Sequence, residues 1–455
     1  MMLFILTALT SVPFTLSAAN AEGGAPQNVV LLYFNGDNNL NGEVLHALDM
    51  IETVGSSENL HIFVLYDGHK DYVGDYGPEW AGTRLIYVTR DDEMGVIRSR
   101  VIEDYGERNL GVAETLEAFI RKGLEIEADR YMFGIFSHGR GIIDTDRLAP
   151  SGPHKTLAIS VDDTDAGLLT LGQFREAIQR PLAGRKFELM IFFTCLTNMV
   201  EIGYELKEVT RYIIGSEDEI RIVNSPPGRF QIRGIRFERF LKTIFDDPGI
   251  SARDIGVHIV DDYIGQYAVG HQLPDVGGVP QSYRYAGSLS ITDCGALDPL
   301  ASELDVLAGY LMEKLESGPE KLRYLEVIRR AQSASQRYPS FLNLEYYDLP
   351  DYLHQLGQET TDTGLKILCS RITQMLRDKV LVYEKHTDDT ESNGLSIYLS
   401  HTGIPENIFS AHQQMYRQSR FSIDTQWDEL IDRIRSTDVN QRSVGAGDRF
   451  EPATH

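Results

Sequence analysis

Two short apolar runs in this chain end on reactive residues. Residues 131–139 read YMFGIFSHG, and residues 188–196 read ELMIFFTCL. Short apolar runs of this kind are typical of strands buried on both faces of a parallel sheet. In open α/β sheets the ligand site lies at the carboxyl ends of such strands. We therefore expect His138 and Cys195 to face one another across a cleft, as a Cys–His nucleophilic enzyme requires.

Each of the two residues also has a structural explanation. A lone cysteine is often a small buried hydrophobic group, and a lone histidine is often a structural residue. The presence of both residues at the ends of similar strands favours a catalytic role over a structural one. Gly139 follows His138 and lets a substrate backbone come close. A helical pattern over residues 197–209 is expected to put Cys195 at a helix N-terminus, which would favour its thiolate.

Strand-like and helix-like stretches alternate through the first half of the chain. The strands are expected at residues 29–34, 61–67, 85–90, 131–136, 157–161, 188–193 and 212–216. The helices between them are expected near residues 42–54, 112–125, 171–179 and 197–209. This alternation predicts βαβ units, and hence an α/β fold in which helices flank a mainly parallel sheet.

The second half of the chain is predicted to be mostly helical. Helical patterns cover residues 297–315, 321–335, 349–356 and 364–379, and a strand at 394–400 is a candidate to rejoin the main sheet. A Gly/Pro-rich stretch at 274–280 marks a boundary or an exposed loop. We therefore expect a catalytic domain at 22–273, a mostly helical region at 281–435 and a polar tail at 436–455.

The beginning of the chain has the pattern of an export signal. Residues 1–21 carry no charge, are apolar from Leu3 to Leu16, and end in Ala19-Asn20-Ala21, which fits a signal-peptidase site. No later apolar stretch approaches the length of a membrane span. We expect a periplasmic or secreted protein that does not insert in the membrane after the signal is removed.

The net charge of the 455-residue chain is −24. Such an acidic balance argues against nucleic acid or an anionic membrane as a partner. The 3 cysteines, Cys195, Cys294 and Cys369, are too few for a disulfide scaffold, although a Cys294–Cys369 pair stays open. The acidic run 162–165 lacks EF-hand spacing and is either a Ca²⁺ loop or a solvated turn. No cofactor is expected for the chemistry itself.

Several segments occur in an order found in one known family. They are residues 30–33 and 36–40 (GDNNL), residues 111–119, 128–131 and 137–139 around the histidine, residues 186–196 with Glu201 and 204–206 around the cysteine, and residues 347–349 and 394–398. Together they span most of the chain and resemble the clostripain family of cysteine peptidases, within the caspase-like clan.

This resemblance implies a cysteine endopeptidase that acts on peptide or protein substrates through a dyad. Cys195 would be the nucleophile, and His138 would assist proton transfer. The backbone N–H groups of Gly139 and Cys195 would form the oxyanion hole. Asp37 and Asn38 are expected near the same rim, although a structural Asx turn is an equal explanation for them.

The chain departs from the family pattern just before the cysteine. The family carries an acid two residues before its cysteine, in the S1 pocket, where this chain has Phe193. A preference for Arg or Lys at P1 is thereby put in doubt, unless Glu217, Asp218 or Glu219 supplies the missing charge. If none of them does, Phe193 is expected to contact the substrate in a more apolar pocket. These acids are equally explained as a solvated loop. The alternative function is a catalytically inactive caspase-like binding or structural protein.

The connection between the two reactive strands suggests processing. Residues 144–155 form a polar stretch that contains proline and glycine, which is typical of an exposed loop where cleavage concentrates. Family members are often cut in this region. We expect self-cleavage after Lys155 or, as a second choice, after Arg147. The alternative is an uncut and constitutively open enzyme.

Overall fold

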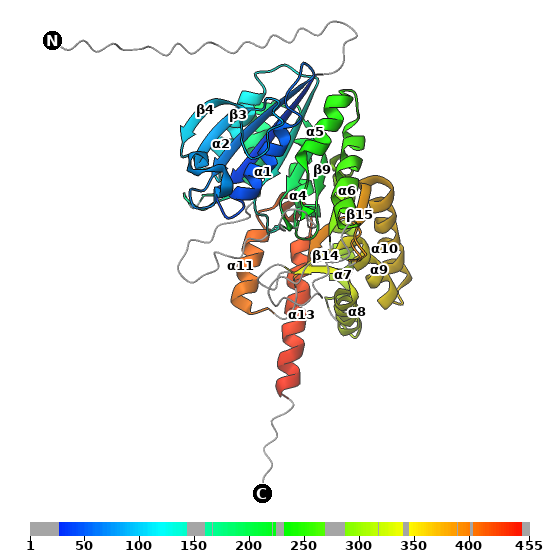
Figure 1. Ribbon diagram of the computed structural model, residues 1–455. Helices are drawn as coiled ribbons and strands as arrows, with labels where there is room; N and C mark the ends of the chain where they lie inside the picture. The colour runs from blue at the N-terminus through cyan, green and yellow to red at the C-terminus, as the bar shows by residue number, and fades with distance from the viewer. Residues whose placement is uncertain are drawn as a thin grey trace, which may run out of the picture.

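The computed structural model describes residues 27–142, 160–165, 167–220, 222–223, 232–268, 287–316, 318–339, 345–388, 390–400 and 404–447. Its centre is a nine-stranded sheet in the order β15-β12-β9-β8-β5-β1-β2-β3-β4 (Figure 1). The strands are β1 (Asn28–Gly36), β2 (Leu60–Gly68), β3 (Gly82–Tyr87), β4 (Arg100–Gly106), β5 (Arg130–Phe136), β8 (Phe187–Phe193), β9 (Thr210–Gly215), β12 (Ser288–Asp293) and β15 (Leu381–His386).

The middle of the sheet is parallel and its edges are antiparallel. Strands β9, β8, β5, β1 and β2 run parallel to their neighbours, whereas β3 and β4 at one edge, and β12 and β15 at the other, pair antiparallel. This arrangement confirms the predicted α/β fold with a mainly parallel sheet.

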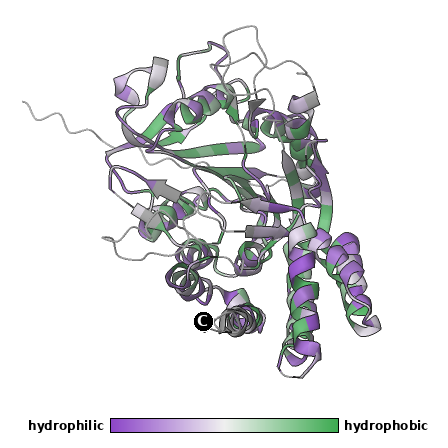
Figure 2. Ribbon diagram, turned by 90° about the horizontal axis from the view of Figure 1, so that it is seen from below, coloured by the Kyte–Doolittle hydropathy of each residue, from purple (hydrophilic) through white to green (hydrophobic). Residues whose placement is uncertain are grey.

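Helices cover both faces of the sheet because the central strands are apolar on both sides. Val29, Leu31 and Tyr33 of β1 join one core cluster, and Val30 and Leu32 join the other. The first cluster packs under α2 (Ala113–Gly123), α3 (Leu171–Leu182), α4 (Val200–Leu206) and α7 (Leu297–Lys314), and the second under α1 (Asn41–Glu52), α5 (Phe237–Asp246) and α6 (Ala252–Ala268). Several strands inside the sheet are accordingly green along much of their length in Figure 2.

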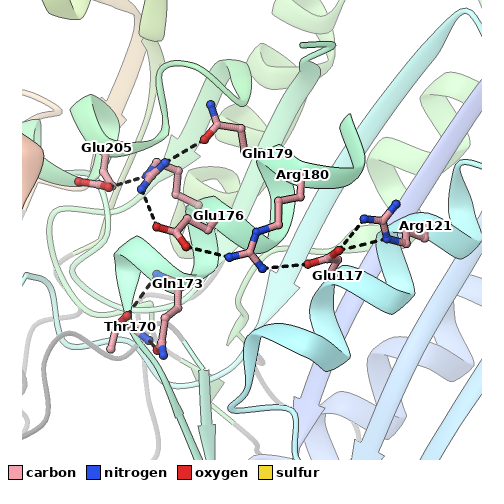
Figure 3. Close-up of polar contacts among 9 residues, drawn as sticks. Glu117, Arg121, Thr170, Gln173, Glu176, Gln179, Arg180 and Glu205 are labelled. Atoms are coloured by element: carbon pink, nitrogen blue, oxygen red, sulfur yellow. Dashed lines mark hydrogen bonds and ion pairs between the residues drawn. The ribbon is translucent and has the colours of Figure 1, made fainter. Parts of the chain in front are cut away.

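Ion pairs connect α2, α3 and α4 on the first face (Figure 3). Arg180 contacts Glu176 on its own helix and Glu117 on α2. Arg175 donates to Glu205 of α4 across 2.8 Å, and this pair is much less exposed than the Arg180 pairs. The network fixes α4, the helix that follows the turn of Cys195, to its neighbours.

The region after residue 287 contributes to the main sheet and also adds its own elements. Besides β12 and β15 it contains the strands β13 (Arg337–Pro339), β14 (Glu345–Asp348) and β16 (Ser396–Tyr398), and the helices α8 (Glu320–Ala334), α9 (Leu349–Glu359), α10 (Thr363–Met375), η4 (Leu376–Val380), α11 (Glu406–Tyr416), α12 (Arg420–Asp424) and α13 (Trp427–Gly447). Helices α7 to α10 gather beside the β12–β15 edge (Figure 1).

Two expectations about this second half are wrong. The second half also supplies two strands of the main sheet, β12 and β15, which the sequence did not predict. The strand expected at 394–400 appears as β16 in a separate sheet with β13 and β14. Helix α13 continues to Gly447, through the start of the predicted tail at 436.

Short elements complete the described part of the chain. They are η1 (Gly74–Tyr76), η2 (Pro78–Trp80), the hairpin of β6 (Ser160–Asp162) and β7 (Gly167–Leu169), the hairpin of β10 (Ile222–Val223) and β11 (Ile232–Arg233), and η3 (Cys294–Ala296). Cys294 and Cys369 are both buried and unpaired. Within the described ranges, no helix combines the length and the apolar character needed to cross a membrane.

Candidate active site

His138 follows β5 and Cys195 follows β8, and these two strands are parallel neighbours in the sheet. Each residue lies two positions after the last residue of its strand. Phe136 at the end of β5 is in register with Phe193 at the end of β8. The pairing extends one step further, because the Ser137 N–H donates to the Phe193 carbonyl across 3.4 Å. The structure therefore brings the two predicted residues to the same edge of the sheet, two positions beyond the same register pair.

The backbones that carry the two residues lie against each other at Gly139. A Cβ atom built on Gly139 would lie 2.4 Å from the Cys195 carbonyl oxygen and 2.9 Å from the Cys195 nitrogen. Real Cβ atoms do not approach other atoms so closely, so only glycine fits at this position. The predicted oxyanion residues, Gly139 and Cys195, are thus in direct backbone proximity.

Asn39 contacts the imidazole and was not singled out in the sequence. His138 Nε2 lies 2.8 Å from Asn39 Oδ1. Asn39 stands just beyond β1, the strand beside β5, so the sheet order brings it close. The only signal in the sequence is its place in the GDNNL segment after a predicted strand.

The other two residues of that segment have structural roles. Asn38 Oδ1 accepts from the Leu40 N–H at 2.9 Å, which is an Asx turn. Both carboxylate oxygens of Asp37 accept from Thr164, one from its N–H and one from its hydroxyl. Asp37 is 1% exposed. For these two residues, the structural explanation fits the contacts better than a role at the rim.

Cys195 lies in a tight turn and not at a helix N-terminus. Helix α4 begins at Val200, so the predicted helix over 197–209 starts too early and its dipole does not act on the thiol directly. Leu196, the next residue, has a φ of +57°, which is unusual for a residue other than glycine. The Leu196 N–H donates to the Asp218 carbonyl, and the Thr197 N–H donates to that of Ser216. The turn is therefore tied to the segment after β9.

Asn198 connects this turn to the C-terminal region. Its carbonyl accepts from the Ser396 N–H at 3.0 Å, and its side-chain amide donates to the Gly394 carbonyl. Its Oδ1 accepts from the Thr292 hydroxyl at 3.1 Å. Asn198 is 1% exposed. The shape of the cysteine turn thus depends on residues from the last part of the chain.

The three acids that were predicted to set the substrate preference lie in two different environments. Glu217 is 1% exposed, and its Oε2 accepts from the Gly394 N–H at 2.6 Å and from Ser392. Burial, followed by the charge of Asp348, raises the pKa of Glu217 well above its usual value. Glu217 is an interior group that holds the C-terminal region, which contradicts its expected role as an acid open to the substrate.

Asp218 and Glu219 lie near the Cys195 thiol, as their predicted role requires. Both side chains are partly exposed, and the adjacent Ile220 carbonyl lies 4.0 Å from the Cys195 sulfur. Because Asp218 also accepts the Leu196 N–H through its carbonyl, these two acids sit directly beside the cysteine turn.

Phe193 is part of the core beneath the strand ends. It is 3% exposed and stacks on Phe136 with ring centroids 3.9 Å apart. Its ring also fills the space where Gly234 would carry a Cβ. The expectation that its side chain contacts substrate is therefore not met, because neighbouring side chains surround it.

A cleft of about 260 Å³ opens next to the stacked rings of Phe136 and Phe193. It is lined by residues of α1 and η1 and by residues near the ends of β5, β10 and α5: Gly42, Glu43, His46, Ala47, Met50, Gly74, Tyr76, Phe136, Ile222, Ile235, Arg236, Phe237 and Glu238. Phe136 lies two positions before His138, and Ile222 lies two positions after the carbonyl that contacts the thiol. Two of the lining residues are thus close in sequence to the candidate site, whereas His138 and Cys195 themselves do not line this cleft.

Some of the predicted features lie outside the described residues. These are the signal at 1–21, the stretch at 274–280, and the processing residues Arg147 and Lys155.

Comparisons with known proteins agree with this geometry. The chain matches the description "Clostripain family" over residues 32–433. Its fold is similar to an inactive zymogen C11 protease from Parabacteroides distasonis, with 18% identity, a TM-score of 0.59, and coverage of 88% of this chain and 99% of that chain.

A secreted C11 cysteine protease from Bacteroides thetaiotaomicron, in complex with an irreversible peptide inhibitor, gives 19% identity, a TM-score of 0.60, and coverage of 89% and 99%. The comparison with curated proteins gave no match. The family match covers most of the sequence, and the chain belongs to the clostripain family of cysteine peptidases.

Proposed function

We propose that the protein is an exported cysteine endopeptidase that uses His138 and Cys195 as a catalytic dyad. The observation that supports it best is the contact at Gly139, where the backbone after the histidine lies against the backbone of the cysteine. Two reactive residues that follow adjacent parallel strands, with their backbones in contact, support their assignment as nucleophile and proton donor.

The dyad accounts for each bond change in peptide hydrolysis. The Cys195 thiolate attacks the scissile carbonyl, and the negative charge that develops on its oxygen is stabilised by the N–H groups of Gly139 and Cys195. His138 then protonates the leaving amine, and an acyl-enzyme remains. Water, deprotonated by His138, attacks this thioester and releases the acid and the thiol.

Two variants test the dyad. We expect Cys195→Ala and His138→Ala to fold and to lose peptidase activity, as measured on a peptide mixture by mass spectrometry. A thiol-directed affinity label should react with the wild type near neutral pH, because only an activated thiol is reactive there. Substantial peptidase activity in Cys195→Ala would contradict the mechanism. An unreactive Cys195 would favour the alternative of an inactive binding or structural protein.

For substrate preference, we propose that cleavage after Arg or Lys is retained through Asp218 and Glu219. Their partly exposed carboxylates beside the cysteine turn could pair with a guanidinium or ammonium group. The absence of an acid two positions before Cys195 supports the competing preference for an apolar P1 residue. A cleavage profile on a peptide library, with Cys195→Ala as control, separates the two. No cleavage after Arg or Lys would exclude the basic preference.

Export and self-processing belong to the same proposal. Removal of residues 1–21 predicts a mature chain that begins at Glu22, and recovery of intact Met1 from an extracytoplasmic fraction would contradict it. Processing predicts a cut after Lys155 or Arg147 in the wild type and an intact Cys195→Ala chain. An intact and fully active wild type would exclude processing, and a cut in both proteins would indicate a foreign protease.

A further inference from the structure

Two buried carboxyl groups bind consecutive backbone amides in the segment just before β16. The Asn393 N–H donates to Asp348 Oδ2 across 2.5 Å, and the Gly394 N–H donates to Glu217 Oε2 across 2.6 Å. Glu217 is 1% exposed and Asp348 is 0% exposed. Because neighbouring amides are close along the chain, the two acids that they bind are also close, and the charge of Asp348 acts on Glu217.

No basic side chain balances this pair. Within the described ranges, neither carboxyl group forms an ion pair with lysine, arginine or histidine. The titratable groups that face Glu217 are Asp348 from β14 and Tyr338 from β13, whose hydroxyl donates to Oε2 at 3.3 Å. Asp351 of α9 faces Asp348 in turn, and Asp218 acts on Tyr338. Two negative charges here would therefore repel each other with no described positive charge to offset them.

The hydrogen bonds distinguish the two acids. Both oxygens of Asp348 are bonded, because Oδ1 accepts from the Asp351 N–H at 2.9 Å and Oδ2 accepts from the Asn393 N–H. Glu217 receives its three donors on Oε2, and its Oε1 has no hydrogen-bond partner in the described part of the chain. A buried charge with an unpartnered oxygen is costly, and a neutral carboxyl group costs less. Of the two acids, Glu217 is therefore the one that keeps a proton.

Glu217 lies between two carbonyls that hold the turn of Cys195. The carbonyl of the residue before it accepts two N–H groups of the turn, at 2.9 and 3.0 Å, and the carbonyl of the residue after it accepts a third at 3.1 Å. On the other side, Gly394 accepts the side-chain amide of Asn198 through its carbonyl. Any movement of the Glu217 side chain is thus passed to the cysteine turn through its own backbone and through Gly394.

We propose that Glu217 is a positioning residue for Cys195 that acts as a neutral carboxylic acid. In this form it accepts the Gly394 N–H beside a charged Asp348 without repulsion. When it releases its proton to solvent, two buried anions face each other and the segment at 392–394 separates from the end of β9, which loosens the cysteine turn. The effect on activity rests on the proposed dyad, whereas the effect on stability does not.

The first test measures stability against pH in the full-length Cys195→Ala chain, which removes self-digestion as a variable. The unfolded chain releases the Glu217 proton near its usual pKa of 4.5, whereas the folded chain keeps it, so this group lowers stability as the pH rises above 4.5. Glu217→Gln has nearly the same shape and no charge to release. Its melting temperature should fall less between about pH 5 and pH 8, by about 2 °C or more.

The matched control for this test is Glu391→Gln, which removes an exposed acid from the same segment. Its melting temperature should follow that of the parent across the whole pH range. Equal slopes in the parent and in Glu217→Gln would overturn the proposal, as would a slope in Glu391→Gln that changes as much as in Glu217→Gln.

The second test compares kcat in the wild type, Glu217→Gln and Glu217→Ala. Glutamine keeps an oxygen that accepts the Gly394 N–H, and alanine removes it. We expect Glu217→Gln to stay within about threefold of the wild type near pH 7 and Glu217→Ala to lose about tenfold or more, as when a buried donor is left without its partner. Glu217→Gln should also lose less activity above pH 8. Equal losses in the two variants would overturn the neutral form.

The two tests separate this inference from the proposed function. An inactive wild type would contradict the dyad, and the rate at which a thiol reagent modifies Cys195 then takes the place of kcat, with the same order of variants expected. A wild type that is active, with an unchanged melting slope in Glu217→Gln, would contradict the role of Glu217 alone.

Discussion

The imidazole of His138 is held by Asn39, a residue 99 positions earlier in the chain, through a contact of 2.8 Å between His138 Nε2 and Asn39 Oδ1. The amide oxygen accepts a hydrogen bond, so the neutral imidazole carries its proton on Nε2 and keeps Nδ1 as its basic nitrogen. In the proposed dyad, Asn39 would be a positioning residue that sets the ring orientation of His138.

Replacing Asn39 should lower activity without unfolding the protein. We expect Asn39→Leu to reduce kcat/KM up to about a hundredfold, because a misplaced catalytic group can cost that much. Asn39→Asp keeps an acceptor and should retain more activity. Both values are measured with one peptide substrate, and circular dichroism confirms the fold. Equal losses in the two variants would contradict a role that depends on the acceptor.

Gly139→Ala should separate the two backbones of the site. The added Cβ would lie 2.4 Å from the Cys195 carbonyl oxygen, so the turn must move and the oxyanion N–H groups lose their alignment. Loss of one such donor typically lowers kcat about 10²–10³-fold. The matched control is Gly172→Ala on α3, where a Cβ would meet no atom within 4 Å. Full activity in Gly139→Ala would contradict the close approach.

The ion pairs of Figure 3 should differ in their contribution to stability. Arg175→Leu removes the 2.8 Å partner of Glu205, which is 4% exposed and keeps Arg420 at 3.8 Å, and should lower the free energy of unfolding by about 2 kcal/mol. Arg180→Leu breaks pairs in which both side chains are more exposed and should cost less than about 1 kcal/mol. Urea unfolding measures both, and equal effects would contradict the role of burial.

His412 should make the protein sensitive to acid. It is 0% exposed, neither ring nitrogen has a hydrogen-bond partner in the described structure, and burial lowers its pKa from 6.5 to about 4. A lowered pKa gives stability that is present above pH 6.5 and is lost as the pH falls toward 4, by about 3 kcal/mol at most.

His412→Leu should therefore flatten the fall in stability between pH 6.5 and 4. The exposed His354 provides the control, because His354→Leu should leave the pH dependence unchanged. Melting temperatures measured across this range decide the outcome. An unchanged slope in His412→Leu would contradict the assignment.

The sequence predicted the central strands well because they are apolar on both faces. The runs at 29–34, 131–136 and 188–193 all lie within β1, β5 and β8. Strand β4 was missed because most of its residues are exposed and many are charged. The end of α13 was missed for a related reason, since a polar helical segment has no apolar pattern that separates it from a tail.

The site was predictable in part. A strand end followed by a reactive residue indicates the edge of the sheet, and the structure puts His138 and Cys195 there. Asn39 and Asn198 act through contacts between distant parts of the chain, which local patterns do not contain. Glu217 was misjudged because a single acid in a sequence gives no sign of whether it is buried.

The contacts of Asn198 have a consequence for the order of events during synthesis. The turn that carries Cys195 receives hydrogen bonds from Ser396 and gives one to Gly394, so its final shape requires residues that are added about 200 positions later. A growing chain contains the cysteine long before it contains these partners. The turn that carries Cys195 is therefore expected to reach its final shape only when the chain is almost complete.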